Sequence, residues 1–177
     1  MKKLKSEELG RLNEEEVRQS KRASIIVILD DVRSGHNVGS IFRTCDAFLI
    51  EELMLCGFTP TPPHREINRS ALGSTRTVKW EHFKDGPAAI AAARQRGYAI
   101  YAIEHTSSSL QLNEMAQHKN AKVALVFGNE VNGISDASLK ECSEAFEIPM
   151  FGNKHSFNVS VCAGIVLWET WRSVGMK

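Results

Sequence analysis

The stretch Ser24–Arg43, SIIVILDDVRSGHNVGSIFR, indicates the fold class most clearly. Its first part, Ser24–Leu29, is continuously apolar after Ser24, which is typical of a β-strand covered on both faces of a sheet. A polar loop follows, and a helix is expected over Val38–Phe48. A buried strand, a polar loop and a helix in this order indicate an α/β domain.

The same alternation continues along the chain. Further strands are expected at Glu52–Cys56, Tyr98–Ile103, Lys122–Phe127 and Phe146–Ile148. Helices are expected at Pro87–Arg96, Ser135–Cys142 and Val159–Arg172, with a short one near Asn68–Leu72 inside the irregular region Thr59–Arg76. Such alternation favours a mostly parallel sheet with helices on both faces.

The first 23 residues have a different pattern. Residues 6–20 are expected to be helical, because Ser6 can cap a helix and Leu9, Leu12 and Val17 form one thin apolar stripe. Basic and acidic residues alternate here, as on a solvated surface helix or on an appendage that faces RNA or a partner. We therefore expect a helical extension over residues 1–23 and one α/β domain over residues 24–177.

Composition narrows the class of protein. The 177 residues include 22 Lys and Arg against 21 Asp and Glu, and this net charge of +1 excludes a histone-like polycation but not a local basic face. Cys45, Cys56, Cys142 and Cys162 never form Cys-x-x-Cys, which indicates reduced, buried thiols. The charged N-terminus has no signal-peptide core, and no apolar run approaches the ~20 residues that span a bilayer. We expect a cytoplasmic protein without a membrane segment.

Three loops that follow predicted strands are rich in Asn, Arg, Ser and Gly and carry Glu130. Ligands of open α/β sheets bind beyond the carboxyl ends of the strands, where these loops lie. The loops are DDVRSGHNVGSIFR (Asp30–Arg43), GNEVNGIS (Gly128–Ser135) and PMFGNKHSFNVS (Pro149–Ser160). Such residues hold a polar ligand through backbone groups and amides.

Several familiar sites are missing from these loops. Gly35-x-x-x-Gly39 is not the G-x-G-x-x-G of dinucleotide-binding enzymes, which argues against an oxidoreductase. Gly128-x-x-x-x-Gly133 is followed by Ile-Ser rather than by the Lys-Ser/Thr of a P-loop. Zinc-deaminase and nucleophile-elbow patterns are absent as well, and no metal site is predicted.

Three segments carry a family resemblance. They are NVGSIFRT (Asn37–Thr44), LVFGNEVNGI (Leu125–Ile134) and IPMFGNKHSFNVS (Ile148–Ser160). In this order they resemble the three motifs of SpoU/TrmH-type RNA 2′-O-ribose methyltransferases of the SPOUT class, over about residues 24 to 172. The resemblance implies an α/β fold with a C-terminal trefoil knot, S-adenosyl-L-methionine as the methyl donor, and a homodimer whose site is completed across the interface. It also implies an RNA substrate, with tRNA favoured over rRNA.

Site residues follow from the positions that match these motifs. The resemblance assigns donor binding to Gly128, Ile148, Met150, Ser156 and Phe157, and to Thr106 or its neighbours in a further loop. It assigns the polar catalytic set to Asn37, Arg43, Glu130, Ser156 and Asn158. Phe157 replaces a commoner leucine and Cys162 a smaller residue, but no polar catalytic group is lost.

Methyl transfer to a hydroxyl requires that the ribose oxygen be held ~3 Å from the methyl carbon while water is excluded. Arg43 can grip a phosphate with two hydrogen bonds, and Ser156 and Asn158 can orient the hydroxyl or the donor. The proton acceptor stays open. A guanidinium is a poor base, and Glu130 is the more natural acceptor, although it can instead anchor Arg43 or a partner group.

One alternative to the enzyme and the role of one basic segment remain open. A catalytically silent RNA-binding relative would have the same fold, but it would not need the intact catalytic set. The basic segment His64–Arg76 can track phosphates or form a solvated loop. Trp168, on the last predicted helix, is a candidate for the dimer interface.

Overall fold

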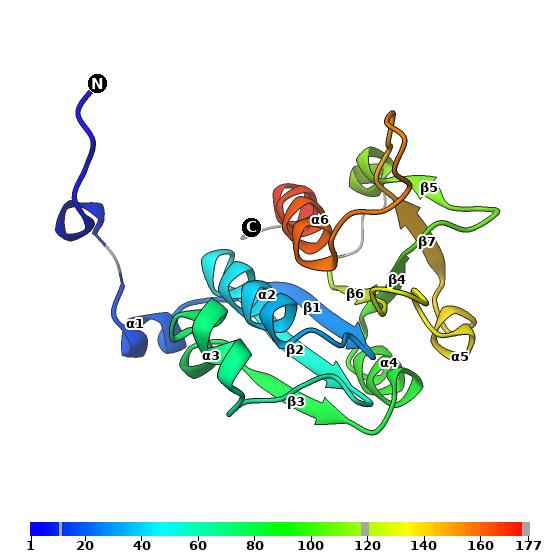
Figure 1. The fold of residues 1–177 in the computed structure, drawn as a ribbon, viewed down its shortest axis with the longest axis horizontal. Coiled ribbons are helices and arrows are strands. Elements are labelled where there is room, and N and C mark those ends of the chain that lie inside the picture. Colours follow the sequence, from blue (N-terminus) through cyan, green and yellow to red (C-terminus); the bar gives the residue numbers. More distant parts are fainter. Residues whose placement is uncertain (11, 118–120, 175–177) are drawn as a thin grey trace.

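The computed structural model describes residues 1–10, 12–117 and 121–174, so the last three residues of the predicted domain lie outside the described part. The strands are β1 Ala23–Asp30, β2 Ile50–Cys56, β3 Trp80–Phe83, β4 Ala99–Ile103, β5 Leu110–Gln111, β6 Val123–Phe127 and β7 Glu144–Glu147. Among the described residues they form one sheet in the order β3-β2-β1-β6-β4-β7-β5, and all neighbours are parallel (Figure 1). The predicted fold class is confirmed.

Helices cover both faces of this sheet. The α-helices are α1 Glu14–Gln19, α2 Gly35–Ala47, α3 Arg65–Ala71, α4 Gly86–Gln95, α5 Asp136–Leu139 and α6 Val159–Val174. The 3-10 helices are η1 Ser6–Leu9, η2 Ser74–Arg76 and η3 Leu112–Gln117. Helix α6 packs against α2 and η3, and α2 packs against α3, whereas α4 contacts α5 (Figure 1).

Strand β1 shows why the sheet is covered on both sides. Ile25, Val27 and Leu29 pack into one hydrophobic core, and Ile26 and Ile28 pack into the other. Successive side chains of a strand point to opposite faces, so a continuously apolar strand supplies both cores. Because β1 is buried between β2 and β6, the loop that follows it is fixed at the carboxyl edge of the sheet.

Helix α2 begins where Ser34 caps it, since the Ser34 hydroxyl accepts a hydrogen bond from the Asn37 amide at 3.4 Å. Gly39 lies against α3, where a Cβ atom would overlap the Ser70 Oγ and approach the Ile67 carbonyl oxygen to 2.5 Å. The motif glycine is therefore required for close packing of two helices.

The N-terminal region differs from the single helix expected over residues 6–20. It forms the two short helices η1 and α1, because Gly10 adopts a left-handed backbone conformation (φ 56°) and Asn13 starts a new helix by accepting a hydrogen bond from the Glu16 amide. In Figure 1 the chain before α1 stands away from the sheet. The division of the chain at residue 23 stays a prediction.

Three further findings bear on the sequence-based expectations. The four cysteines are free; Cys45 and Cys56 are buried, whereas Cys142 and Cys162 are partly exposed. Within the described ranges no helix is long and apolar enough to cross a membrane, and no group of three His, Cys, Asp or Glu side chains could hold a metal ion. The C-terminal trefoil knot stays a prediction.

Candidate active site

A cavity of about 490 Å³ lies where the loops after β4, β6 and β7 meet the start of α6. Ligand pockets of proteins commonly measure about 300–1,000 Å³, so a molecule the size of a nucleoside fits. Seven of the predicted site residues line this cavity: Gly128, Glu130, Ile148, Met150, Ser156, Phe157 and Asn158. Two of the three motif segments therefore contribute directly to its wall.

The remaining motif segment, Asn37–Thr44, does not line the cavity but is hydrogen-bonded to Glu130, which does. The Glu130 carboxylate accepts hydrogen bonds from the backbone amides of Arg33 and Ser34, at 2.9 and 3.0 Å, and from the Asn37 side chain at 2.8 Å. Asn37 Oδ1 in turn accepts a hydrogen bond from Asn158 Nδ2 at 3.0 Å. The structure thus brings together Asn37 at the start of α2, Glu130 in the loop after β6 and Asn158 just before α6.

The environment of Glu130 keeps its carboxyl group ionised. Partial burial acts to raise its pKa, but the hydrogen bonds from the Arg33 amide, the Asn37 side chain and the Ser34 amide outweigh it, and the pKa is lowered from its ordinary value of 4.5. Both carboxylate oxygens are engaged. A carboxylate with these partners is a weak proton acceptor and a strong anchor.

Asn158 has a second role at the start of α6. Its Oδ1 accepts a hydrogen bond from the Ser160 amide at 2.9 Å, and its carbonyl oxygen accepts one from the Cys162 amide at 2.9 Å. This is the N-cap arrangement expected from the sequence. One asparagine therefore fixes the helix start and the link to Asn37.

The turn after β6 is held by a residue that sequence reasoning missed. Asn129 is 7% exposed; its Nδ2 donates to the Asp31 carbonyl oxygen at 2.7 Å and its Oδ1 accepts from the Val131 amide at 2.9 Å. A Cβ atom on Gly128 would overlap the backbone of Gly133, so the turn closes tightly upon itself. A polar residue two positions after the end of a buried strand was the available signal for Asn129.

The loop after β4 contributes neighbours of the predicted Thr106, rather than Thr106 itself, to the wall of the cavity. Glu104 and His105 line the cavity, and Thr106 Oγ1 instead accepts a hydrogen bond from the Ser108 amide at 3.3 Å. His105 Nδ1 lies 2.9 Å from an oxygen of Glu147, another lining residue absent from the predicted set. Hydrogen bonds from Ser109, His105 and Gln111 lower the pKa of Glu147.

Arg43 does not join this site within one chain. It lies six residues after Asn37 on α2, which places it about 240° further around the helix. It is exposed, lines a second cavity of about 400 Å³ beside α1, and makes no hydrogen bond or ion pair with the described residues. The polar set predicted from the motifs is therefore split between two places on the molecule.

Comparison with known proteins identifies the family. The profile of the SpoU rRNA Methylase family matches residues 24–168. The chain belongs to this family. A curated SpoU-type relative, the tRNA (guanosine(18)-2′-O)-methyltransferase of Thermus thermophilus, is 32% identical over 158 residues, which are 89% of this chain and 79% of the relative.

Solved structures agree with this assignment to the SpoU family. The TrmH/SpoU tRNA-modifying enzyme of A. aeolicus superposes with a TM-score of 0.78 at 29% identity, over 89% of this chain and 78% of that one. An S-adenosyl-L-methionine-bound rRNA methyltransferase from Sinorhizobium meliloti superposes with a TM-score of 0.73 at 27% identity, over 88% of this chain and 59% of that one. The predicted family, the enzyme class of RNA 2′-O-ribose methyltransferase and the methyl donor are confirmed at the level of the family.

Proposed function

We propose that this chain transfers a methyl group from S-adenosyl-L-methionine to the 2′-hydroxyl of a ribose in RNA, and in tRNA rather than rRNA. The observation that carries the proposal is the hydrogen-bonded connection of Asn37, Glu130 and Asn158, which joins the start of α2, the loop after β6 and the start of α6 at the edge of a donor-sized cavity. The choice of tRNA is supported by the Thermus thermophilus relative, which the chain matches over 79% of its length. We place the reaction in the cytoplasm, with the RNA.

The cavity has the chemistry that the donor needs. Ile148, Met150 and Phe157 offer apolar surface for an adenine ring, and the tight turn at Gly128 presents backbone groups. The donor supplies a methyl group already activated on a sulfonium. The task that remains for the protein is to place the ribose oxygen and to keep water away.

Asn158 and Ser156 orient the hydroxyl in this proposal, because both line the cavity and carry hydrogen-bonding groups. Glu130 acts as an anchor that holds Asn37 and the loop before α2, since both of its oxygens are engaged and its pKa is lowered. We therefore do not assign Glu130 as the acceptor of the proton that the ribose hydroxyl loses. The proton acceptor stays unassigned.

Arg43 enters the site from a second copy of this chain. Helix α6 carries an exposed apolar stripe of Val161, Ile165 and Trp168, which are 51%, 37% and 49% exposed. Helix α6 packs beside α2, the helix that carries Arg43, so a copy that covers this stripe lies close to α2. We propose a homodimer in which Arg43 of one chain grips the target phosphate at the cavity of the other.

The test uses tRNA from a strain that lacks the gene. Purified protein, labelled S-adenosyl-L-methionine and this tRNA should give label at a ribose, located by mapping alkali-resistant positions. Calorimetry should show micromolar-range binding of the donor. Donor binding without methyl transfer to tRNA or rRNA would favour the silent RNA-binding relative, and absence of both would contradict the proposal.

A further inference from the structure

A groove separate from the donor cavity lies between the N-terminal segment and the α2–α3 side of the domain. Its wall includes residues of α1, α2 and η2, among them Glu14, Arg43 and Arg76. Two arginines thus face one groove of about 400 Å³, which is roomy enough for a phosphate and part of a sugar. The Asp46 carboxylate in the same wall is engaged by the Thr77 hydroxyl.

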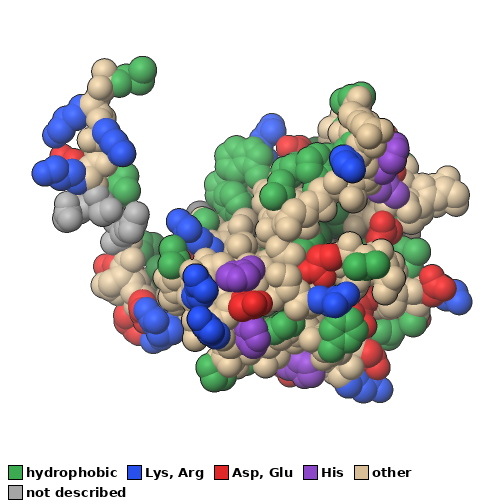
Figure 2. Space-filling model, in the orientation of Figure 1, with side chains coloured by type: hydrophobic (Ala, Val, Ile, Leu, Met, Phe, Trp, Pro, Cys, Tyr) green, Lys and Arg blue, Asp and Glu red, His purple; other side chains and the backbone are tan. Residues whose placement is uncertain are grey.

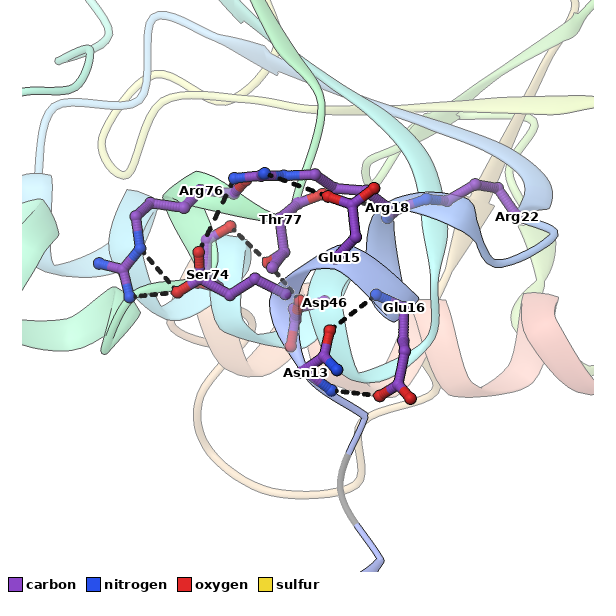
Figure 3. A network of polar contacts seen from close by, with 10 residues as sticks. Asn13, Glu15, Glu16, Arg18, Arg22, Asp46, Ser74, Arg76 and Thr77 are labelled. Carbon is purple, nitrogen blue, oxygen red and sulfur yellow. Dashed lines mark hydrogen bonds and ion pairs between the residues drawn. The ribbon is translucent and has the colours of Figure 1, made fainter.

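Arg76 makes hydrogen bonds through both its guanidinium and its backbone carbonyl oxygen. Its Nε and Nη2 both donate to Glu14 Oε1, at 2.8 and 2.6 Å. Figure 3 shows Arg76 within the surrounding network of polar contacts. Its carbonyl oxygen accepts hydrogen bonds from Arg18 at 3.2 and 3.3 Å, and Gly73 begins the η2 turn with a left-handed φ of 96°. The guanidinium is therefore positioned before any RNA arrives.

The partner of Arg76 is easily exchanged. The Arg76 and Glu14 side chains are 62% and 46% exposed, and ion pairs in water of this kind contribute little to stability. Glu14 lies on a six-residue helix that belongs to the N-terminal segment. A phosphate offers the same oxygen acceptors with a geometry that suits a guanidinium fork.

We propose that Arg76 binds a phosphate of the RNA substrate and that Glu14 occupies this position in the free protein. The inference rests on the proposed function, since Arg43 in the same groove is the arginine assigned to the target phosphate, so an RNA strand that reaches Arg43 passes Arg76. Lys2, Lys3 and Lys5 on the same N-terminal segment are exposed. Figure 2 shows Lys and Arg side chains on the part of this segment that stands clear of the domain. RNA that displaces Glu14 therefore meets further cations.

The test compares tRNA affinities of four variants of the full chain: Glu14→Gln, Glu15→Gln, Arg76→Gln, and Glu14→Gln with Arg76→Gln. Glu15 is the matched control, because it lies next to Glu14 on α1, is 65% exposed and loses the same charge. Glu14→Gln should lower the Kd for tRNA by about threefold to tenfold, and Glu15→Gln by less than about twofold. Arg76→Gln should weaken binding and reduce the salt dependence by about one phosphate contact.

The combined variant decides the mechanism. If Glu14 competes with RNA for Arg76, the combined variant binds tRNA as Arg76→Gln does, and the gain from Glu14→Gln disappears. Equal gains from Glu14→Gln and Glu15→Gln, or a gain that persists without Arg76, would overturn the inference. This pattern with inorganic phosphate, together with equal tRNA affinities in all four variants, would overturn the assignment to RNA.

Methyl transfer at saturating tRNA separates this inference from the proposed function. The control Glu15→Gln should keep the wild-type rate, because Glu15 lines neither the donor cavity nor the groove of Arg43 and Arg76. If the wild-type chain methylates no RNA, the proposed function fails. The pattern of tRNA affinities still decides the inference on Arg76 and Glu14 in that case.

Discussion

Asn37 and Glu130 act as one unit at the scale of the residue. Their side chains are joined at 2.8 Å, and each also holds a separate loop, through Asn158 and through Arg33 and Ser34. Removing either side chain removes the hydrogen bond between Asn37 and Glu130. The effects of removing both should therefore not multiply.

We expect Asn37→Ala and Glu130→Gln each to lower kcat by about 100-fold, since a misplacement of about 1 Å has an effect of this size. The double variant should be no slower than the slower single one. Single-turnover rates with saturating tRNA measure this. Glu141→Gln removes an exposed carboxylate paired with Arg94 at 2.9 Å and should leave kcat unchanged. A fully multiplicative double variant would contradict the shared role.

The pH dependence of stability tests the anchor separately. The folded pKa of Glu130 is lowered, so its contribution is complete above the ordinary value of 4.5 and is lost as the pH falls through the lowered folded pKa. The difference in Tm between wild type and Glu130→Gln should therefore be constant at neutral pH and vanish in acid. A difference that grows in acid would show that the carboxyl group is protonated in the folded protein.

Some residues of the candidate site could be placed from the sequence and others could not, for physical reasons. Gly128, Glu130 and Asn158 are close to strand ends or a helix start, so their place follows from the order of elements. Arg43 is on a helix, where the face it occupies depends on how α2 is rotated against the sheet. Asn129 and Glu147 serve backbone and side-chain partners that only the folded loops bring near.

The close packing of helix α2 against helix α3 depends on Gly39 and contributes to the stability of the fold. Gly39→Ala should destabilise the fold by about 1–3 kcal/mol, because its new Cβ overlaps Ser70 and crowds the Ile67 carbonyl oxygen. Chemical denaturation measures the change. Gly39→Ala with Ser70→Ala should recover only part of it, since the Ile67 carbonyl remains. Ser40→Ala, one residue along the same helix, should stay within about 0.5 kcal/mol of wild type.

Elements were predictable where hydrophobic burial alone determines them. The central strands β1, β2, β4 and β6 are long, apolar runs, and the sequence located each within two residues. The strands β3 and β5 lie at the edges of the sheet and were missed. The sequence of β3, WEHF, has no apolar run, and β5 spans only two residues, so both depend on pairing with a neighbour.

The exposed apolar stripe on α6 predicts the oligomeric state of the whole molecule. Ile165→Glu should convert a dimer into a monomer and abolish methyl transfer, because it places a carboxylate within an apolar interface. Sedimentation velocity measures the oligomeric state. Phe58→Glu, an apolar-to-charged change at a side chain that is 61% exposed and lies after β2, should remain dimeric. A wild-type chain that sediments as a monomer would contradict the proposed assembly.

Because Arg43 lies outside the donor cavity of its own chain, two inactive variants should complement each other in a mixed dimer. Arg43→Ala and Ser156→Ala should each abolish turnover alone, and Arg43→Ala should still bind the donor because Arg43 is outside the donor cavity. In a mixed dimer the intact cavity of the Arg43→Ala chain receives Arg43 from the Ser156→Ala chain. Coexpression in equal amounts should therefore restore about a quarter of wild-type activity, since half of the dimers are mixed and each has one complete site. If Arg43 instead served the cavity of its own chain, every site in the mixture would lack one group, and no activity would return.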